Sequence, residues 1–181
     1  NYNYFKIFLF RLGVCGCYVL SSCICSFCAT VVLGFPDCGL GVSGPQIVEG
    51  WYGQPWGKPY YRIKDYVTIM KKIWAREEPV THEGREISLP YKGEGALGIG
   101  KPLKSILHMN PDIPVFLGTG MESTVRMTAE IADGWLPLGF VPETAHLYED
   151  WINEGLAKGG KEPEQFERQV MTSVKVTDDV Q

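Results

Sequence analysis

Residues 113–137, IPVFLGTGMESTVRMTAEIADGWLP, decide the fold of this chain. The stretch begins with the apolar, β-branched run 113–117, whose length and composition predict a buried strand. The turn Gly118-Thr119-Gly120 stops that run, and apolar residues then recur at helical spacing. Asp133-Gly134 ends the helix, and Trp135 opens a second strand. The sequence therefore predicts a strand–helix–strand unit.

The glycine turn of this unit is a candidate binding site. Thr119 followed by Glu122 has the spacing of a capping box, which predicts that the helix begins just after the turn. The first backbone N–H groups of a helix have no helical acceptor, and the helix macrodipole favours negative charge at the same end. We therefore expect this turn to attract a phosphate or a carboxylate.

A second turn of the same kind lies earlier in the chain. Residues 39–42 read as the end of a buried strand, and Ser43-Gly44-Pro45-Gln46 follow with capping-box spacing from Ser43 to Gln46. The next segment, 49–59, is rich in glycine, proline and aromatic residues. Two interpretations of Trp51 and Trp56 remain open: they wall a ring-binding pocket, or they pack the loop against the domain.

The remaining segments alternate between helices and strands. We expect a helix over 60–76, a hairpin over 80–91, a helix starting at Pro142 and a final strand over 169–177. The glycine-rich loop 92–101 lacks the GK[ST] of a Walker A loop. Alternating strands and helices imply a parallel α/β sheet with right-handed crossovers. Four such strands do not close a barrel.

Composition sets limits on function. The chain has 181 residues, of which 45% are hydrophobic and 21% charged, as in a globular domain with a real core. The net charge of −4 and the absence of a basic patch in the sequence argue against a nucleic-acid partner. His82, His108 and His146 lie far apart without a metal-binding pattern, and we expect all three at the surface. We assign no metal site and no Ser-His-Asp arrangement.

Residues 1–37 differ in composition from the rest. All six cysteines lie within the first 38 residues, but their spacing matches no zinc pattern, which leaves a metal cluster as a weak interpretation. Residues 13–33 carry no charge and follow Lys6 and Arg11, as in a membrane segment. A third interpretation is a segment that is not native to the domain, produced by a gene-model error. We expect a hydrophobic, Cys-rich leader over 1–37 and a domain over 38–181.

The motifs together carry a resemblance. GLGVSGPQIVEGWYGQPWGKP at 39–59, AREEPVTHEG at 75–84 and IPVFLGTG…AEIADGWLP at 113–137 resemble the luciferase-like monooxygenase family, most closely its branch of coenzyme F420-dependent oxidoreductases. The resemblance covers roughly 39–180. That family has a (β/α)8 (TIM) barrel, and this chain resembles about its fourth to seventh strands. The expected fold class is therefore α/β, a partial barrel.

The resemblance implies a function. It implies an enzyme that transfers a hydride between F420 and an organic small molecule, or one that uses reduced FMN to activate oxygen. By the same resemblance, two sets of residues bind the cofactor: Ser43, Gly44, Pro45 and Gln46 line its ring, and Gly118, Thr119, Gly120 and Met121 bind its phosphate or ring edge. It further implies a cytoplasmic domain that often forms homo-oligomers. Membrane association is expected only if 13–33 is a genuine membrane segment.

The chain also departs from the family pattern. A complete barrel needs ~250 residues, and the early strands that carry the family's proton donors have no counterpart here. No catalytic acid is therefore assigned; Glu49 is the nearest ionisable group to the Ser43 turn, and the alternative is that it pins its loop. An incomplete barrel leaves open sheet edges, so we expect low stability or inactivity of this chain alone. The alternative function is an inactive remnant, truncated or tethered to a membrane.

Overall fold

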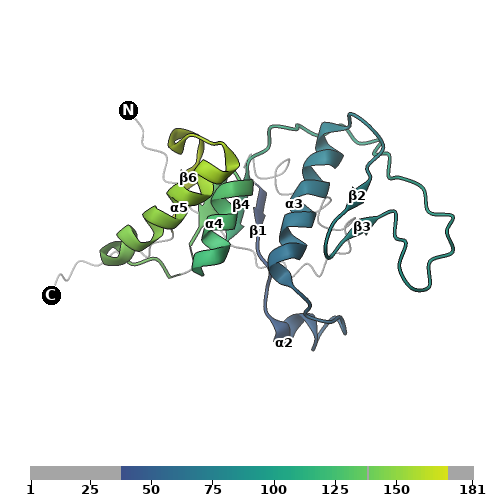
Figure 1. The fold of residues 1–181 in the computed structure, drawn as a ribbon, viewed down its shortest axis with the longest axis horizontal. Coiled ribbons are helices and arrows are strands. Elements are labelled where there is room, and N and C mark those ends of the chain that lie inside the picture. The colour runs from purple at the N-terminus through teal and green to yellow at the C-terminus, as the bar shows by residue number, and fades with distance from the viewer. Residues whose placement is uncertain (1–37, 138, 171–181) are drawn as a thin grey trace, which may run out of the picture. The chain divides into compact units, whose positions relative to one another are not determined.

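The computed structural model describes residues 38–137 and 139–170, and its main sheet is parallel (Figure 1). The four strands lie in the order β1 (Cys38–Leu40), β4 (Val115–Gly118), β5 (Gly134–Leu136) and β6 (Glu167–Arg168), each parallel to its neighbour. A separate antiparallel hairpin joins β2 (His82–Glu83) to β3 (Ser88–Leu89). The predicted parallel sheet and the predicted hairpin are confirmed.

Backbone register and one aspartate join β4 to β5. Phe116 pairs with Gly134, and a Cβ added to Gly134 would lie 2.0 Å from the Phe116 ring, so only glycine fits there. The carboxylate of Asp133 accepts a 2.9 Å hydrogen bond from the N–H of Val115. The N–H of Asp133 in turn donates to the carbonyl of Val115 at 2.8 Å. These bonds fix the start of both strands.

In the part of the chain that the structure describes, three long helices accompany the strands: α3 (Pro59–Ala75), α4 (Glu122–Ile131) and α5 (Ala145–Gly159). Shorter turns are α2 (Pro45–Val48), η1 (Pro142–Thr144) and η2 (Pro163–Gln165). The apolar side chains of α3 that are buried are Ile63, Val67, Ile69, Met70, Ile73 and Trp74. The helical period predicted over 60–76 is confirmed, as is the strand–helix–strand unit β4–α4–β5.

Helices α4 and α5 pack closely, because glycine removes side-chain bulk where they cross (Figure 1). A Cβ added to Gly155 would lie 2.2 Å from the carbonyl oxygen of Arg126 and 2.7 Å from the Cβ of Ala129. The buried cluster around this contact consists of Val125, Ala129, Trp135, Ile152, Leu156 and Phe166. Helix α5 ends at Gly159, and its C-cap Gly160 has a left-handed φ of 63°, a conformation that glycine adopts readily.

Both predicted capping boxes are wrong. The N-cap of α4 is Met121, and no side chain caps it. The hydroxyl of Thr119 instead lies 2.8 Å from that of Thr128 in the core, which draws it away from the helix end. The N-cap of α2 is Gly44, which has no side chain that could cap the helix. Ser43 lies one residue before the N-cap, with a left-handed φ of 61°.

The last predicted strand begins too late. Strand β6 is Glu167–Arg168, and its register is fixed by a 3.0 Å hydrogen bond from the N–H of Glu167 to the carbonyl of Asp133. Residues 169 and 170 are not in a strand. The rest of the predicted strand falls in 171–181, outside the described residues. The interpretations of residues 1–37 also fall outside them. Within 38–137 and 139–170, no helix is both long and apolar enough to cross a membrane.

Candidate functional site

The two predicted turns lie on neighbouring strands at one edge of the sheet. All four strands are parallel, so their carboxyl ends share an edge, where β1 leads to Ser43, Gly44, Pro45 and Gln46 and β4 leads to Thr119, Gly120 and Met121. A Cβ added to Gly118 would lie 3.6 Å from the carbonyl oxygen of Leu40 and 3.9 Å from that of Leu136. In barrels of alternating strands and helices, this edge carries the active site.

The N-terminus of α4 offers backbone N–H groups that have no acceptor within the helix. The first N–H groups that donate within this helix are those of Thr124 and Val125, both to the carbonyl of Met121 at 2.9 and 2.8 Å. The N–H groups of Glu122 and Ser123 come before them and have no helical acceptor. The carboxylate of Glu122 lies in the same turn and is paired with Arg126, which offsets its negative charge.

The residues just before α4 leave this end open. Gly120 and Met121 are exposed, Met121 with 70% of its surface. A Cβ added to Gly120 would meet no atom within 4 Å. A ligand can therefore approach the backbone here without displacing a side chain of the described residues.

Thr119 supports the turn from inside. It is buried, its hydroxyl is bonded to that of Thr128, and its carbonyl accepts a 2.9 Å hydrogen bond from Nε1 of Trp135. Its side chain is therefore committed to the core. Any contact with a cofactor would use its backbone.

The Ser43 turn holds an unusual backbone conformation. A φ of 61° is uncommon for a residue other than glycine, and such conformations cost on the order of 1 kcal/mol and concentrate at functional sites. Gln46 folds back against Gly44, since a Cβ added there would lie 2.7 Å from Oε1 of Gln46. Pro45 begins the single turn of α2. The role of these four residues in binding stays a prediction.

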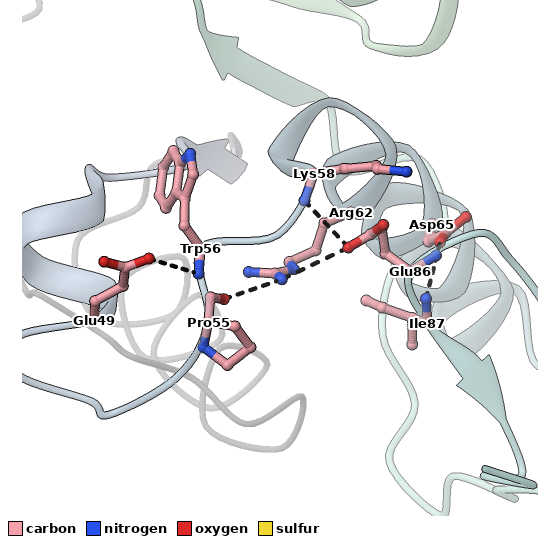
Figure 2. Close-up of polar contacts among 8 residues, drawn as sticks. All are labelled: Glu49, Pro55, Trp56, Lys58, Arg62, Asp65, Glu86 and Ile87. Atoms are coloured by element: carbon pink, nitrogen blue, oxygen red, sulfur yellow. Dashed lines mark hydrogen bonds and ion pairs between the residues drawn. The ribbon is translucent and has the colours of Figure 1, made fainter. Parts of the chain in front are cut away.

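The loop after α2 is pinned by Glu49. Oε1 of Glu49 accepts a hydrogen bond from the N–H of Trp56 at 3.3 Å (Figure 2). This contact matches the interpretation of Glu49 as a residue that pins its loop. Trp51 is 66% exposed and so does not pack against the described part of the domain, whereas Trp56 is half-buried. A ring-binding role for the two tryptophans stays a prediction.

An acidic clamp that the sequence analysis did not find lies beside this loop. Oδ2 of Asp65, on α3, accepts hydrogen bonds from the N–H groups of Glu86 at 2.7 Å and Ile87 at 3.0 Å. Oδ1 of Asp65 lies 3.1 Å from Nε2 of His82. A Cβ added to Gly84 of the THEG motif would lie 2.2 Å from the Asp65 carboxyl carbon, so only glycine allows this close approach.

The clamp changes the expectation for one histidine and shifts one pKa. His82 is half-buried against α3, so its predicted place at the surface is wrong, while His108 and His146 are exposed as expected. Burial raises the pKa of the Asp65 carboxyl, but the hydrogen bonds from the hairpin backbone and from His82 lower it by more. Asp65 therefore keeps its charge inside the clamp, and its pKa lies below the ordinary value.

The opposite edge of the sheet is a separate region. A cavity of about 640 Å³ opens there, lined by Pro114, Phe116, Asp133, Phe166 and Arg168 among others, near the amino ends of the strands. In barrels of alternating strands and helices, the amino end of the strands contributes to stability and not to the active site. Among the described residues, no group of three or more His, Cys, Asp or Glu side chains is arranged to hold a metal ion.

Sequence comparison identifies relatives of the chain. The profile of the family described as luciferase-like monooxygenase matches residues 36–181. A Mycobacterium tuberculosis protein named "Putative coenzyme F420-dependent oxidoreductase" is 48% identical over 144 residues, which cover 78% of this chain and 42% of that relative. The 5,10-methylenetetrahydromethanopterin reductase of Archaeoglobus fulgidus is 28% identical over 142 residues, which cover 78% and 38%. The chain spans about two fifths of the length of these relatives.

Two solved structures share the fold. An F420-dependent secondary alcohol dehydrogenase in complex with an F420–acetone adduct matches with a TM-score of 0.62 at 17% identity, over 82% of this chain and 44% of that one. A coenzyme F420-dependent tetrahydromethanopterin reductase from Methanopyrus kandleri matches with a TM-score of 0.58 at 16% identity, over 75% and 40%. At these identities the likeness shows the fold alone. The predicted fold class, a partial α/β barrel, is confirmed.

Proposed function

Because this chain belongs to the luciferase-like monooxygenase family, we propose that it forms part of an oxidoreductase that uses coenzyme F420. The reaction is transfer of a hydride between the deazaflavin ring and a small organic molecule. The names of both curated relatives and of both structural neighbours support an F420-dependent or reductase activity. The observation that carries the proposal is the pair of open turns at the carboxyl ends of β1 and β4.

The residues of the two turns have separate roles in this proposal. Gly120 and Met121, with the first N–H groups of α4, receive a phosphate or an acidic ring edge of the cofactor, since these donors lack helical partners. Ser43 and Gln46 offer polar side chains beside the ring. The cofactor supplies the hydride chemistry, and the protein binds and orients it.

Exposed apolar side chains at the same edge suit an organic substrate. Val42 follows β1 and is 37% exposed, Met121 follows β4 and is 70% exposed, and Val141 follows β5 and is 48% exposed. Ligand pockets are lined mainly by apolar groups with a few polar ones. This combination favours a substrate with a substantial apolar part.

Titration of the purified protein with F420, followed by cofactor fluorescence, tests the proposal. Gly120→Ala should weaken F420 binding by about tenfold or more, equal to about 1.4 kcal/mol, because its methyl group enters space that a ligand would use. Its thermal unfolding should match wild type, since the Cβ meets no atom within 4 Å.

The matched control is Gly39→Ala in β1, where the added Cβ makes an ordinary 3.6 Å contact with Leu136. This variant should bind as wild type does. A parallel titration with FMN identifies the flavin alternative. A folded protein that binds neither cofactor would overturn the proposal and favour the inactive remnant, and so would equal F420 affinity of Gly120→Ala and wild type.

A further inference from the structure

We infer that the β2–β3 hairpin positions the Ser43 turn of the candidate cofactor site. Glu86 is the positioning residue that links the hairpin to this turn, through its contacts with the loop 49–58. The inference rests on the proposed function, because it treats the Ser43 turn as part of the F420 site. It assigns a role to a segment that lies far from that turn in the sequence. A series of contacts leads from α3 to the turn.

The hairpin is firmly attached to α3. The Asp65 carboxylate accepts the N–H groups of Glu86 and Ile87 at 2.7 and 3.0 Å, both within the normal range for N–H···O bonds. Gly84 lies so close to that carboxylate that no side chain fits between them. Glu86 therefore extends from a rigid base.

The side chain of Glu86 reaches the loop 49–58. Its Oε2 accepts a hydrogen bond from the N–H of Lys58 at 3.3 Å and lies 3.7 Å from Nη2 of Arg62. The same Nη2 of Arg62 donates to the carbonyl of Pro55 at 3.4 Å (Figure 2). The Glu86 side chain is 17% exposed, so water screens the pair less than at an open surface. Pro55 and Lys58, the two ends of a short loop segment, are thus both hydrogen-bonded to the Arg62–Glu86 pair.

Gly57 gives independent evidence of this close approach. Its φ is 62°, and an added Cβ would lie 2.5 Å from Nη2 of Arg62 and 3.0 Å from Oε2 of Glu86. The loop backbone therefore rests directly on the pair. A side chain at position 57 would displace the Arg62 guanidinium and would be strained at this left-handed φ.

The loop in turn holds α2 and the turn before it. Oε1 of Glu49 accepts the N–H of Trp56 at 3.3 Å, and the N–H of Gln54 donates to the carbonyl of Val48 at 3.2 Å. Val48 ends α2, whose first residue is Pro45 of the candidate turn. The left-handed Ser43 needs support from its surroundings to persist. Loosening the loop should therefore let the turn relax.

Hydrogen exchange of backbone amides, read by mass spectrometry on the protein without cofactor, tests the coupling. Glu86→Ala should speed exchange several-fold in peptides from 49–58 and from 43–48. Glu86→Gln keeps an acceptor for Lys58 but loses the charge opposite Arg62, so it should restore part of the protection. The control is Glu83→Ala on the same hairpin, whose carboxylate is bonded to Lys92 at 2.7 Å and is 78% exposed.

F420 affinity supplies the functional readout. Glu86→Ala should bind F420 several-fold more weakly than Glu83→Ala, with Glu86→Gln between them. The inference is wrong if Glu86→Ala and Glu83→Ala exchange alike over 43–58, or if exchange changes and affinity does not. If wild type fails to bind F420, the proposed function fails, and exchange over 43–48 alone decides whether the hairpin holds the turn.

Discussion

Nε1 of Trp135 donates a 2.9 Å hydrogen bond to the backbone carbonyl of Thr119, which joins β5 to the turn before α4. Trp135→Phe keeps an aromatic ring but removes this donor. We expect the free energy of unfolding to fall by about 2–4 kcal/mol, because the Thr119 carbonyl loses its donor and the smaller ring leaves a cavity in the core. F420 binding should weaken because the turn loses support. Urea denaturation and cofactor titration measure the two effects.

Trp151→Phe is the matched control, because Trp151 is only half-buried at the edge of the same aromatic cluster. It should leave F420 binding unchanged. Equal affinities of the two variants would show that the Trp135 bond does not support the turn.

The lowered pKa of Asp65 predicts that the stability of the protein depends on pH. The folded-state pKa of Asp65 is lowered, so its contribution is present above the unfolded pKa and is lost as pH falls through the folded pKa. We expect Asp65→Asn to lower the free energy of unfolding at pH 7 by about 1–3 kcal/mol, because an amide serves the hairpin donors less well. The difference from wild type should shrink below about pH 4.

Urea denaturation at pH 7 and pH 3 compares wild type with Asp65→Asn. Glu83→Gln, on the exposed side of the hairpin, provides the control. A difference between wild type and Asp65→Asn that is the same at both pH values would mean that the Asp65 charge adds nothing to the clamp.

The close contact of α4 with α5 at Gly155 predicts that a larger side chain there destabilises the fold. Gly155→Ala places a methyl group 2.2 Å from the carbonyl oxygen of Arg126, so the helices must separate. We expect a loss of about 1–3 kcal/mol in the free energy of unfolding, as for overpacked cores. Asn153→Ala, on the exposed side of α5, should stay within about 0.5 kcal/mol of wild type. Thermal denaturation of both variants checks this, and equal midpoints would contradict it.

Patterns that depend on burial could be predicted from the sequence. The apolar run 113–117 and the apolar spacing of α3 and α4 indicate which side chains face the core. These elements therefore lie where the periodicity predicts them. The two glycine turns were recognisable because they interrupt such patterns. Their shared edge follows from the parallel order of the strands.

Contacts between distant segments could not be predicted in the same way. The hydroxyl of Thr119 has the spacing of a cap, yet Thr128 competes for it inside the fold. The clamp of Asp65 on the hairpin depends on how β2 and β3 fold over α3, which no local pattern encodes. The alternation over 169–177 is real, but the register set by Asp133 places the strand earlier, at Glu167.

The pairing of β1 with β4 has a consequence for the time course of folding. β4, α4, β5, α5 and β6 follow one another along the chain, whereas α2, α3, the hairpin and a long loop separate Cys38 from its partner Val115. Closing that long loop costs more entropy and slows the contact. During synthesis on the ribosome, the pairing of β1 with β4 must therefore wait until β4 emerges, and the two halves of the candidate site come together only in this late step.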